Sequence, residues 1–198
     1  MADDDDLTEV FERYPTLAGV ARFAQLIGRV PWFRAVGDPL DEPTRQDARR
    51  YLAALGFPDA EPALVPLWED AAVAAESVDW NSPAWEAEEQ LRAAVTADAL
   101  ELVDDAALEL VATHLAGVAG EAATAGAIEA AEFLQIDDEA FVRAAAGAAV
   151  QACHNAGLVL AAGGPGDLDA DHPFSLKFQL FEAGRWPLGL IGLSFNIF

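Results

Sequence analysis

One segment constrains the fold of this chain more than any other. The run from Asp137 to Ala162 has the pattern of a single long helix that is apolar around most of its circumference. Ile136 is placed to pack against Phe141, four residues past the expected start. One side of the run carries a flat seam, mostly of small residues: Phe141, Ala145, Ala148, Ala152 and Val159. Small side chains let a second helix approach closely, so we expect this helix at the centre of a helical bundle.

Shorter apolar patterns predict the helices that would surround it. Steps of three and four residues place one helix between Pro15 and about Val30, and another from residue 41 to residue 56. Residues 59–75 predict a helix that breaks or kinks at Pro66. Further helical patterns start at residue 81 and near residue 100, with Thr96 or Asp104 as points where the helix could restart. About six or seven helices are expected in all.

The C-terminal pattern changes period. Phe174, Leu176, Phe178 and Leu180 alternate with polar residues, and Leu193, Phe195 and Ile197 do the same, which predicts two strands. The turn between them is expected at residues 183–184, and Gly189 and Gly192 are expected to bend or bulge the second strand. The chain is therefore expected to be mainly α, a helical bundle with a C-terminal β-hairpin. We divide it into an acidic disordered tail (1–6), a helical domain (7–162), an acidic Gly/Asp-rich loop (163–172) and a hairpin packed on the helices or on a partner (173–198).

The charge of the chain is large and unevenly distributed. The formal net charge is -23, and residues 51–140 hold twenty acidic side chains against one basic side chain, Arg92. Such a field repels nucleic-acid phosphates and anionic lipid heads, so neither is expected as a partner. A basic partner fits the charge, although acidity can also serve solubility alone.

Cysteine usage and the N-terminus bear on the compartment. Cys153 is the only cysteine, so no internal disulfide is possible and nothing requires an oxidising compartment. Residues 1–6 lack the basic and apolar regions of a signal peptide. Arg143, Gln151, His154 and Asn155 interrupt the most apolar helix, which argues against a membrane span. The expected location is the cytoplasm.

The sequence offers little for catalysis or cofactor binding, and we expect no cofactor. His114 falls on the apolar side of its predicted helix, which favours a core histidine. Cys153 and His154 are neighbours on a helix, so their side chains diverge by about 100° and cannot form a catalytic pair. Asp167, Asp169 and Asp171 alternate as calcium ligands do, but His172 stands where a glycine is required. We interpret this loop as a flexible linker, with weak divalent-cation binding as the alternative.

Indoles and carboxylates gather in the acidic middle of the chain. Together they attract ammonium and guanidinium groups through cation-π and ion-pair contacts. The candidate cation-binding or partner-binding residues are Trp68, Glu69, Asp79, Trp80, Trp85, Glu86, Glu88 and Glu89. A packed core with outward-facing acids is the simpler interpretation of the same pattern.

Two functions remain open, and the first is preferred. The chain could be a non-catalytic interaction or regulatory protein that binds a basic protein. Alternatively, it could be a helical small-ligand binder or enzyme, with a pocket near Arg143 and His154, which share a helix side with Gly147, or near His114. Self-association through the C-terminal hairpin is a further hypothesis, because strand edges and an apolar end invite pairing.

Overall fold

A computed structural model describes residues 4–76, 82–164 and 166–198 of the chain. Its helices are α1 (Asp4–Arg13), α2 (Ala18–Ile27), α3 (Glu42–Leu55), α4 (Trp68–Glu76), α5 (Pro83–Leu102), α6 (Asp105–Leu134), α7 (Glu139–Gly163) and α8 (Pro173–Glu182), with a 3-10 turn at Pro15–Leu17. The strands are β1 (Glu61–Leu64), β2 (Pro187–Ile191) and β3 (Ser194–Ile197). The expected mainly α fold with a C-terminal hairpin is therefore confirmed.

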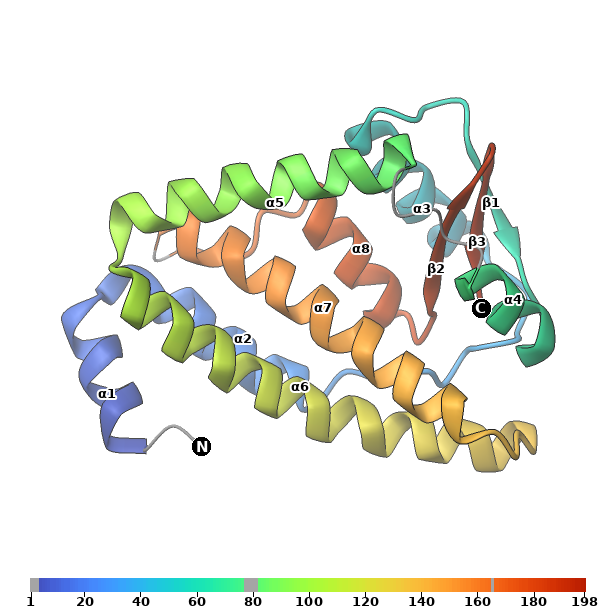
Figure 1. The fold of residues 1–198 in the computed structure, drawn as a ribbon, viewed down its shortest axis with the longest axis horizontal. Coiled ribbons are helices and arrows are strands. Elements are labelled where there is room, and N and C mark those ends of the chain that lie inside the picture. Colours follow the sequence, from blue (N-terminus) through green and yellow to red (C-terminus); the bar gives the residue numbers. More distant parts are fainter. Residues whose placement is uncertain (1–3, 77–81, 165) are drawn as a thin grey trace.

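The long helix α7 lies at the centre of the molecule, between α5 and α6, with α8 behind it (Figure 1). Its buried alanines, such as Ala145 and Ala149, face a protein interior to which α6 contributes Ala119, Ala123 and Ala127. Within the described ranges, α7 is the one helix that is long and apolar enough to cross a bilayer, but 67% of its most apolar window is buried inside the protein. Its apolar surface is therefore covered by neighbouring helices, as the seam of small residues predicts.

Capping side chains explain where several helices begin and end. Asp41 accepts a hydrogen bond from the Thr44 amide (2.9 Å), and the helix that follows ends at Gly56, whose φ of 98° suits a left-handed cap. Ser82 and Asp104 cap α5 and α6 in the same way. For α7 the capping residue is Asp138, one residue after the expected start.

The three strands form one small sheet beside the helices, in the order β1-β3-β2. Strand β3 pairs antiparallel with β2, with the turn around Gly192, and parallel with β1, where Pro62 lies opposite Phe195. The predicted helix over 59–75 is therefore wrong in its first half. Residues 61–64 instead complete the sheet, and Pro62 is tolerated because β1 is an edge strand.

The strand predicted from residue 174 to residue 180 is also wrong, because this segment is helix α8. His172 caps it by accepting from the Phe174 amide (3.1 Å), and Pro173 occupies the first helical position. The apolar residues alternate because the helix is buried on two opposite faces. Phe174, Phe178 and Phe181 belong to the main core, whereas Leu176 and Leu180 belong to a second core with α3 and the sheet. The expected turn at 183–184 is instead the end of this helix, where Gly184 has a φ of 75°.

The N-terminal and loop boundaries can be compared with those expected. Helix α1 begins at Asp4, inside the tail expected to be disordered, and residues 1–3 lie outside the described residues. The loop expected at 163–172 falls between the end of α7 at Gly163 and the start of α8 at Pro173.

Candidate functional site

A cavity of about 290 Å³ lies between α3, α5, α7, α8 and β2. Each of these elements contributes side chains to it, so the wall is built from segments far apart in the sequence. Its lining residues include Ala144 and Gln151 of α7, which are exposed, and Leu52 and Phe181, which are buried. This volume is just below the usual range of small-molecule sites, about 300 to 1,000 Å³, so the cavity suits a small ligand.

Glu88 of α5 is the centre of the polar part of the wall. Its Oε1 accepts hydrogen bonds from the Tyr51 hydroxyl of α3 and from Nζ of Lys177 of α8, the latter at 2.6 Å. The side chains of Glu88 and Lys177 are only 16% and 22% exposed. A carboxylate this far from water is stable only when it is paired and hydrogen-bonded, and both conditions are met here.

The protonation states of this trio follow from its surroundings. Burial raises the pKa of Glu88, but the charge and hydrogen bond of Lys177, with help from Tyr51 and Arg92, outweigh burial and hold that pKa below its usual value. Burial and the nearby Glu88 charge raise the pKa of Tyr51 well above 10. At neutral pH Glu88 is therefore a carboxylate, and Tyr51 is a neutral phenol that donates its proton to Glu88.

Arg92 supplies a second cation, one turn along α5 from Glu88. Its Nε donates to Oδ1 of the buried Asn155 of α7 (3.0 Å), and its Nη1 donates to Glu89. The guanidinium carbon also lies 6.0 Å from the centre of the Phe174 ring. Among the described residues, Nη2 makes no hydrogen bond. The Arg92 side chain is thus held in place, while its Nη2 stays available to donate a hydrogen bond to a ligand.

Apolar side chains form the rest of the wall. Trp85 of α5 and Trp186, which precedes β2, contribute indole rings. Leu55, Leu188 and Leu190 add aliphatic surface. The Trp186 ring is held in position because it stacks on the ring of Trp68, with ring centres 5.9 Å apart. The cavity therefore combines one charged side with a larger apolar side.

The charge balance of the wall differs from that of the chain. Among its lining residues are two cations, Arg92 and Lys177, and one anion, Glu88, in a chain of net charge -23. Every other carboxylate of residues 51–140 whose side chain is described is exposed, except the half-buried Glu89. Lys177 is paired with Glu88 and Arg92 with Glu89, so the charged side of the cavity is close to neutral. An anionic ligand would therefore meet less repulsion here than on the strongly negative rest of the molecule.

Among the described residues, the tryptophans and carboxylates that the sequence indicates as a candidate site lie on two different helices, α5 and α4. Trp85, Glu86, Glu88 and Glu89 lie in the first turns of α5, and of these Trp85 and Glu88 line the cavity. Trp68 is buried behind Trp186 and does not line the cavity, and Glu69, the next residue in the chain, is exposed. Asp79 and Trp80 lie outside the described residues.

The structure does not bring Arg143 and His154 together. They are eleven residues apart on α7, which corresponds to about 16 Å along the helix axis. Arg143 is exposed, and its charge adds only a minor part to the lowering of the Asp138 pKa, which the hydrogen bond from Trp68 dominates. Burial, with the charge of Arg92, lowers the pKa of the half-buried His154. His114 is half-buried on α6. The wall of the cavity includes none of these three residues.

The three aspartates of the 163–172 loop are engaged in different contacts. Asp167 pairs with Arg22 (3.1 Å) and Asp171 pairs with Arg50 (2.7 Å), while Asp169 accepts from the amide of Asp171 (3.0 Å). In the described part of the chain no group of three or more metal-ligating side chains could hold an ion.

Sequence reasoning missed Tyr51, Lys177, Arg92 and Asn155 as members of a site. Two of them carry a signal that could have found them. Lys177 is the only lysine in the chain, and Arg92 is the only basic residue between positions 51 and 140. Tyr51 and Asn155 have no such signal, because only the fold brings them to the cavity.

The comparisons with known proteins add no assignment: no protein-family model, no curated protein and no solved structure matches this chain.

Proposed function

We propose that the protein is a small-ligand binder whose cavity takes an organic monoanion, such as a carboxylate, with an apolar body. One observation carries the proposal: the single lysine and the single basic residue of the acidic middle both line one cavity, beside two indoles. Basic side chains are so few in this chain that chance placement of both at one cavity is a poor explanation.

The anionic group would lie between Lys177 and Arg92. An ammonium group has three donors, and Glu88 takes one donor of Lys177. Arg92 keeps Nη2 for a ligand oxygen, because its Nε and Nη1 are held by Asn155 and Glu89. The hydrocarbon part of the ligand would then contact Trp85, Trp186 and the leucines of the opposite side, where burial of apolar surface adds affinity.

The Glu88 carboxylate would act as a positioning group. It fixes the Lys177 ammonium through a 2.6 Å contact, so that the lysine does not lose side-chain freedom when the ligand arrives.

We also propose that the protein works in the cytoplasm, because its one thiol, Cys153, is buried and unpaired and requires no oxidising compartment.

A thermal-shift screen tests the proposal. Aliphatic and aromatic monocarboxylates would be compared with their neutral primary amides at equal concentration. An acid at about 100 times its Kd should raise Tm by roughly 5 to 10 °C, and its amide should do much less. If no carboxylate gives a shift beyond that of its amide, the proposed ligand class is wrong.

Two variants locate the binding site. The double variant Glu88→Gln, Lys177→Gln removes both charges and keeps hydrogen-bonding groups of similar size, so it avoids leaving one charge buried alone. It should lose the acid-specific shift. Arg143→Gln removes an exposed cation that does not line the cavity, and it should retain the shift. The opposite result would move the site to α7 near Arg143.

A further inference from the structure

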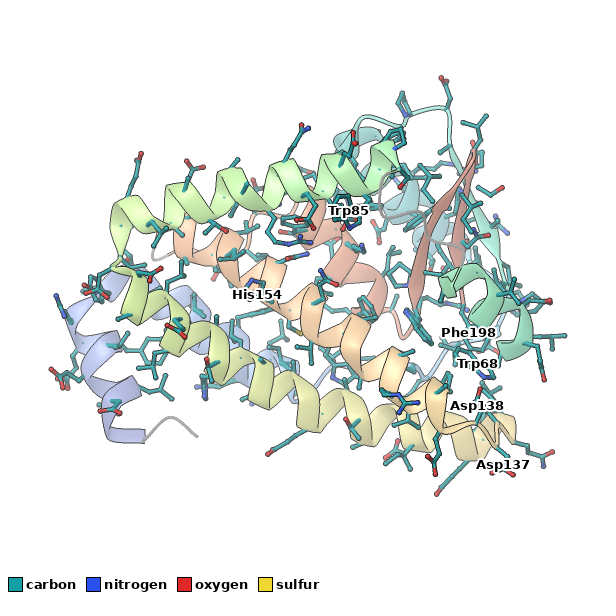
Figure 2. The ribbon with its side chains drawn as sticks, viewed as in Figure 1. Trp68, Trp85, Asp137, Asp138, His154 and Phe198 are labelled. Carbon is teal, nitrogen blue, oxygen red and sulfur yellow. The ribbon has the colours of Figure 1, made fainter. Side chains whose placement is uncertain are left out.

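A second hollow lies at the end of the molecule where α4, the C-terminus of α6 and the start of α7 meet. It is a groove of about 560 Å³, lined by residues 66–69, Ala72, residues 134–138 and Phe198. Figure 2 shows Trp68, Phe198, Asp137 and Asp138 gathered at this end, away from Trp85 and His154. The groove shares no lining residue with the cavity at Glu88 and Lys177, and the stacked rings of Trp68 and Trp186 lie between the two.

The floor of the groove is apolar and fixed. Trp68 and Phe198 are buried, and Trp68 packs against Phe141 with ring centres 5.1 Å apart. The indole Nε1 of Trp68 donates to Oδ2 of Asp138 at 2.8 Å. That contact, with the Ala140 amide, also lowers the pKa of Asp138, so the carboxylate is ionised at neutral pH. A partner would meet a surface that needs no rearrangement.

The rim is acidic. Glu69, Asp137 and Asp138 are exposed, and no lysine, arginine or histidine is among the lining residues. The charge of Arg143 interacts with the Asp138 carboxylate at long range. Glu69 and Asp137 have no ion-pair partner in the described part of the chain. The groove therefore carries a net negative charge that this protein does not neutralise.

Apolar side chains project into solvent at the same end. Leu67, which lines the groove, is 58% exposed, and Phe133, next to the lining residue Leu134, is 83% exposed. A large aromatic side chain left in water at this level contributes nothing to the core. Exposed apolar groups beside a groove rimmed by charge are typical of a protein contact surface.

We infer that this groove docks a basic segment of a partner protein, with an apolar side chain on the floor and lysine or arginine side chains on Glu69 and Asp137. Charge complementarity selects this occupant, because the rim is acidic and the floor apolar. A second copy of this acidic chain would repel the rim, and so would a nucleic acid. The inference is independent of the proposed ligand cavity.

Fluorescence anisotropy with a labelled peptide of alternating lysine and leucine tests the inference. The double variant Glu69→Gln, Asp137→Asn removes two rim charges. The matched control, Glu109→Gln with Glu121→Gln, removes two exposed charges from α6 away from the groove. The rim variant should weaken binding roughly fivefold or more, and the control should change it less than about twofold.

A second peptide separates docking from simple charge attraction. In it every leucine becomes serine while the lysines stay, so its charge is unchanged. The docking proposal requires this peptide to bind more weakly than the first. Equal affinity for both peptides, or equal losses in the rim and control variants, would overturn the proposal, because binding would then follow net charge alone.

Discussion

Burial sets the reactivity of Cys153. The residue is fully enclosed on α7, and burial raises the pKa of its thiol to about 12. The thiolate that reacts with disulfide reagents is therefore almost absent at neutral pH. We predict that Ellman's reagent does not label the native protein and labels one thiol per chain after unfolding in denaturant. Rapid labelling of the native protein would contradict the enclosed position.

His154 should make stability depend on pH. Burial, reinforced by Arg92, lowers its pKa below the ordinary value of 6.5. The unfolded chain therefore binds this proton at a higher pH than the folded chain does, so protonation of His154 lowers stability as the pH falls below about 7. His154→Gln should reduce the loss of unfolding free energy between about pH 7.5 and 5.5, measured by urea titration. The same loss in the variant and the parent protein would show that His154 does not contribute.

At the residue scale, the sequence could identify charges but not their partners. Arg92 and Lys177 are conspicuous because basic residues are rare around them, and that rarity is visible without a structure. Glu88 is one of twenty acids between positions 51 and 140, and nothing local marks it as the one that turns inward. Its partners lie 37 and 89 residues away, so only the packing of α3 and α8 against α5 defines the trio.

At the scale of elements, local signals located most helices and failed where tertiary packing changed the pattern. Caps at Asp41, Ser82 and Asp104 mark helix starts because they satisfy free amides within one turn. The sequence of helix α8 predicts a strand because burial on two faces makes its apolar residues alternate. Strand β1 was missed because it pairs with β3, more than 130 residues later in the chain, and so leaves no local signal.

The close approach of α6 to the segment after α2 yields a test of packing. A methyl group at Gly126 would lie 2.6 Å from Cβ and 2.9 Å from the carbonyl oxygen of Trp32, too close to fit without movement of the backbone. Gly126→Ala should therefore lower the free energy of unfolding by about 1 to 3 kcal/mol in urea denaturation.

Gly117 on the same helix is the matched control. A methyl group there would meet nothing within 4 Å. Gly117→Ala should leave stability unchanged or raise it by about 0.5 to 1 kcal/mol, because alanine is the better helix former. A similar loss in both variants would contradict this explanation, because a methyl group at Gly117 makes no close contact.

At the scale of the whole molecule, the sheet limits how the hairpin could join two copies of the chain. Strand β3 is paired on both sides, so an intermolecular pairing would have to use the outer edge of β1 or of β2. We propose such a dimer only through one of these edges. Light scattering coupled to size exclusion would show it, and a proline at an outward-facing amide of either strand should then restore the monomer mass.

Most carboxylates of the molecule face solvent, whereas the half-buried cations Arg92 and Lys177 line one cavity together with Glu88. This contrast is what the account of function depends on. It implies that the acidic surface and the ligand site are separate, so that screening by salt should weaken peptide docking at the groove more than binding inside the cavity.

The indole resonances of the tryptophans give the most direct test of ligand binding in the cavity. Trp85 and Trp186 line the cavity, whereas Trp32 does not. A two-dimensional nitrogen-proton spectrum therefore shows, in one measurement, the indole signals of the cavity and a control signal from the core. The indole signals would be assigned by single Trp→Phe substitutions, and the protein titrated with the best carboxylate from the thermal-shift screen. We expect saturable shifts of the Trp85 and Trp186 indole signals, with the Trp32 signal unmoved. Saturable binding that leaves the Trp85 and Trp186 signals in place would contradict this expectation.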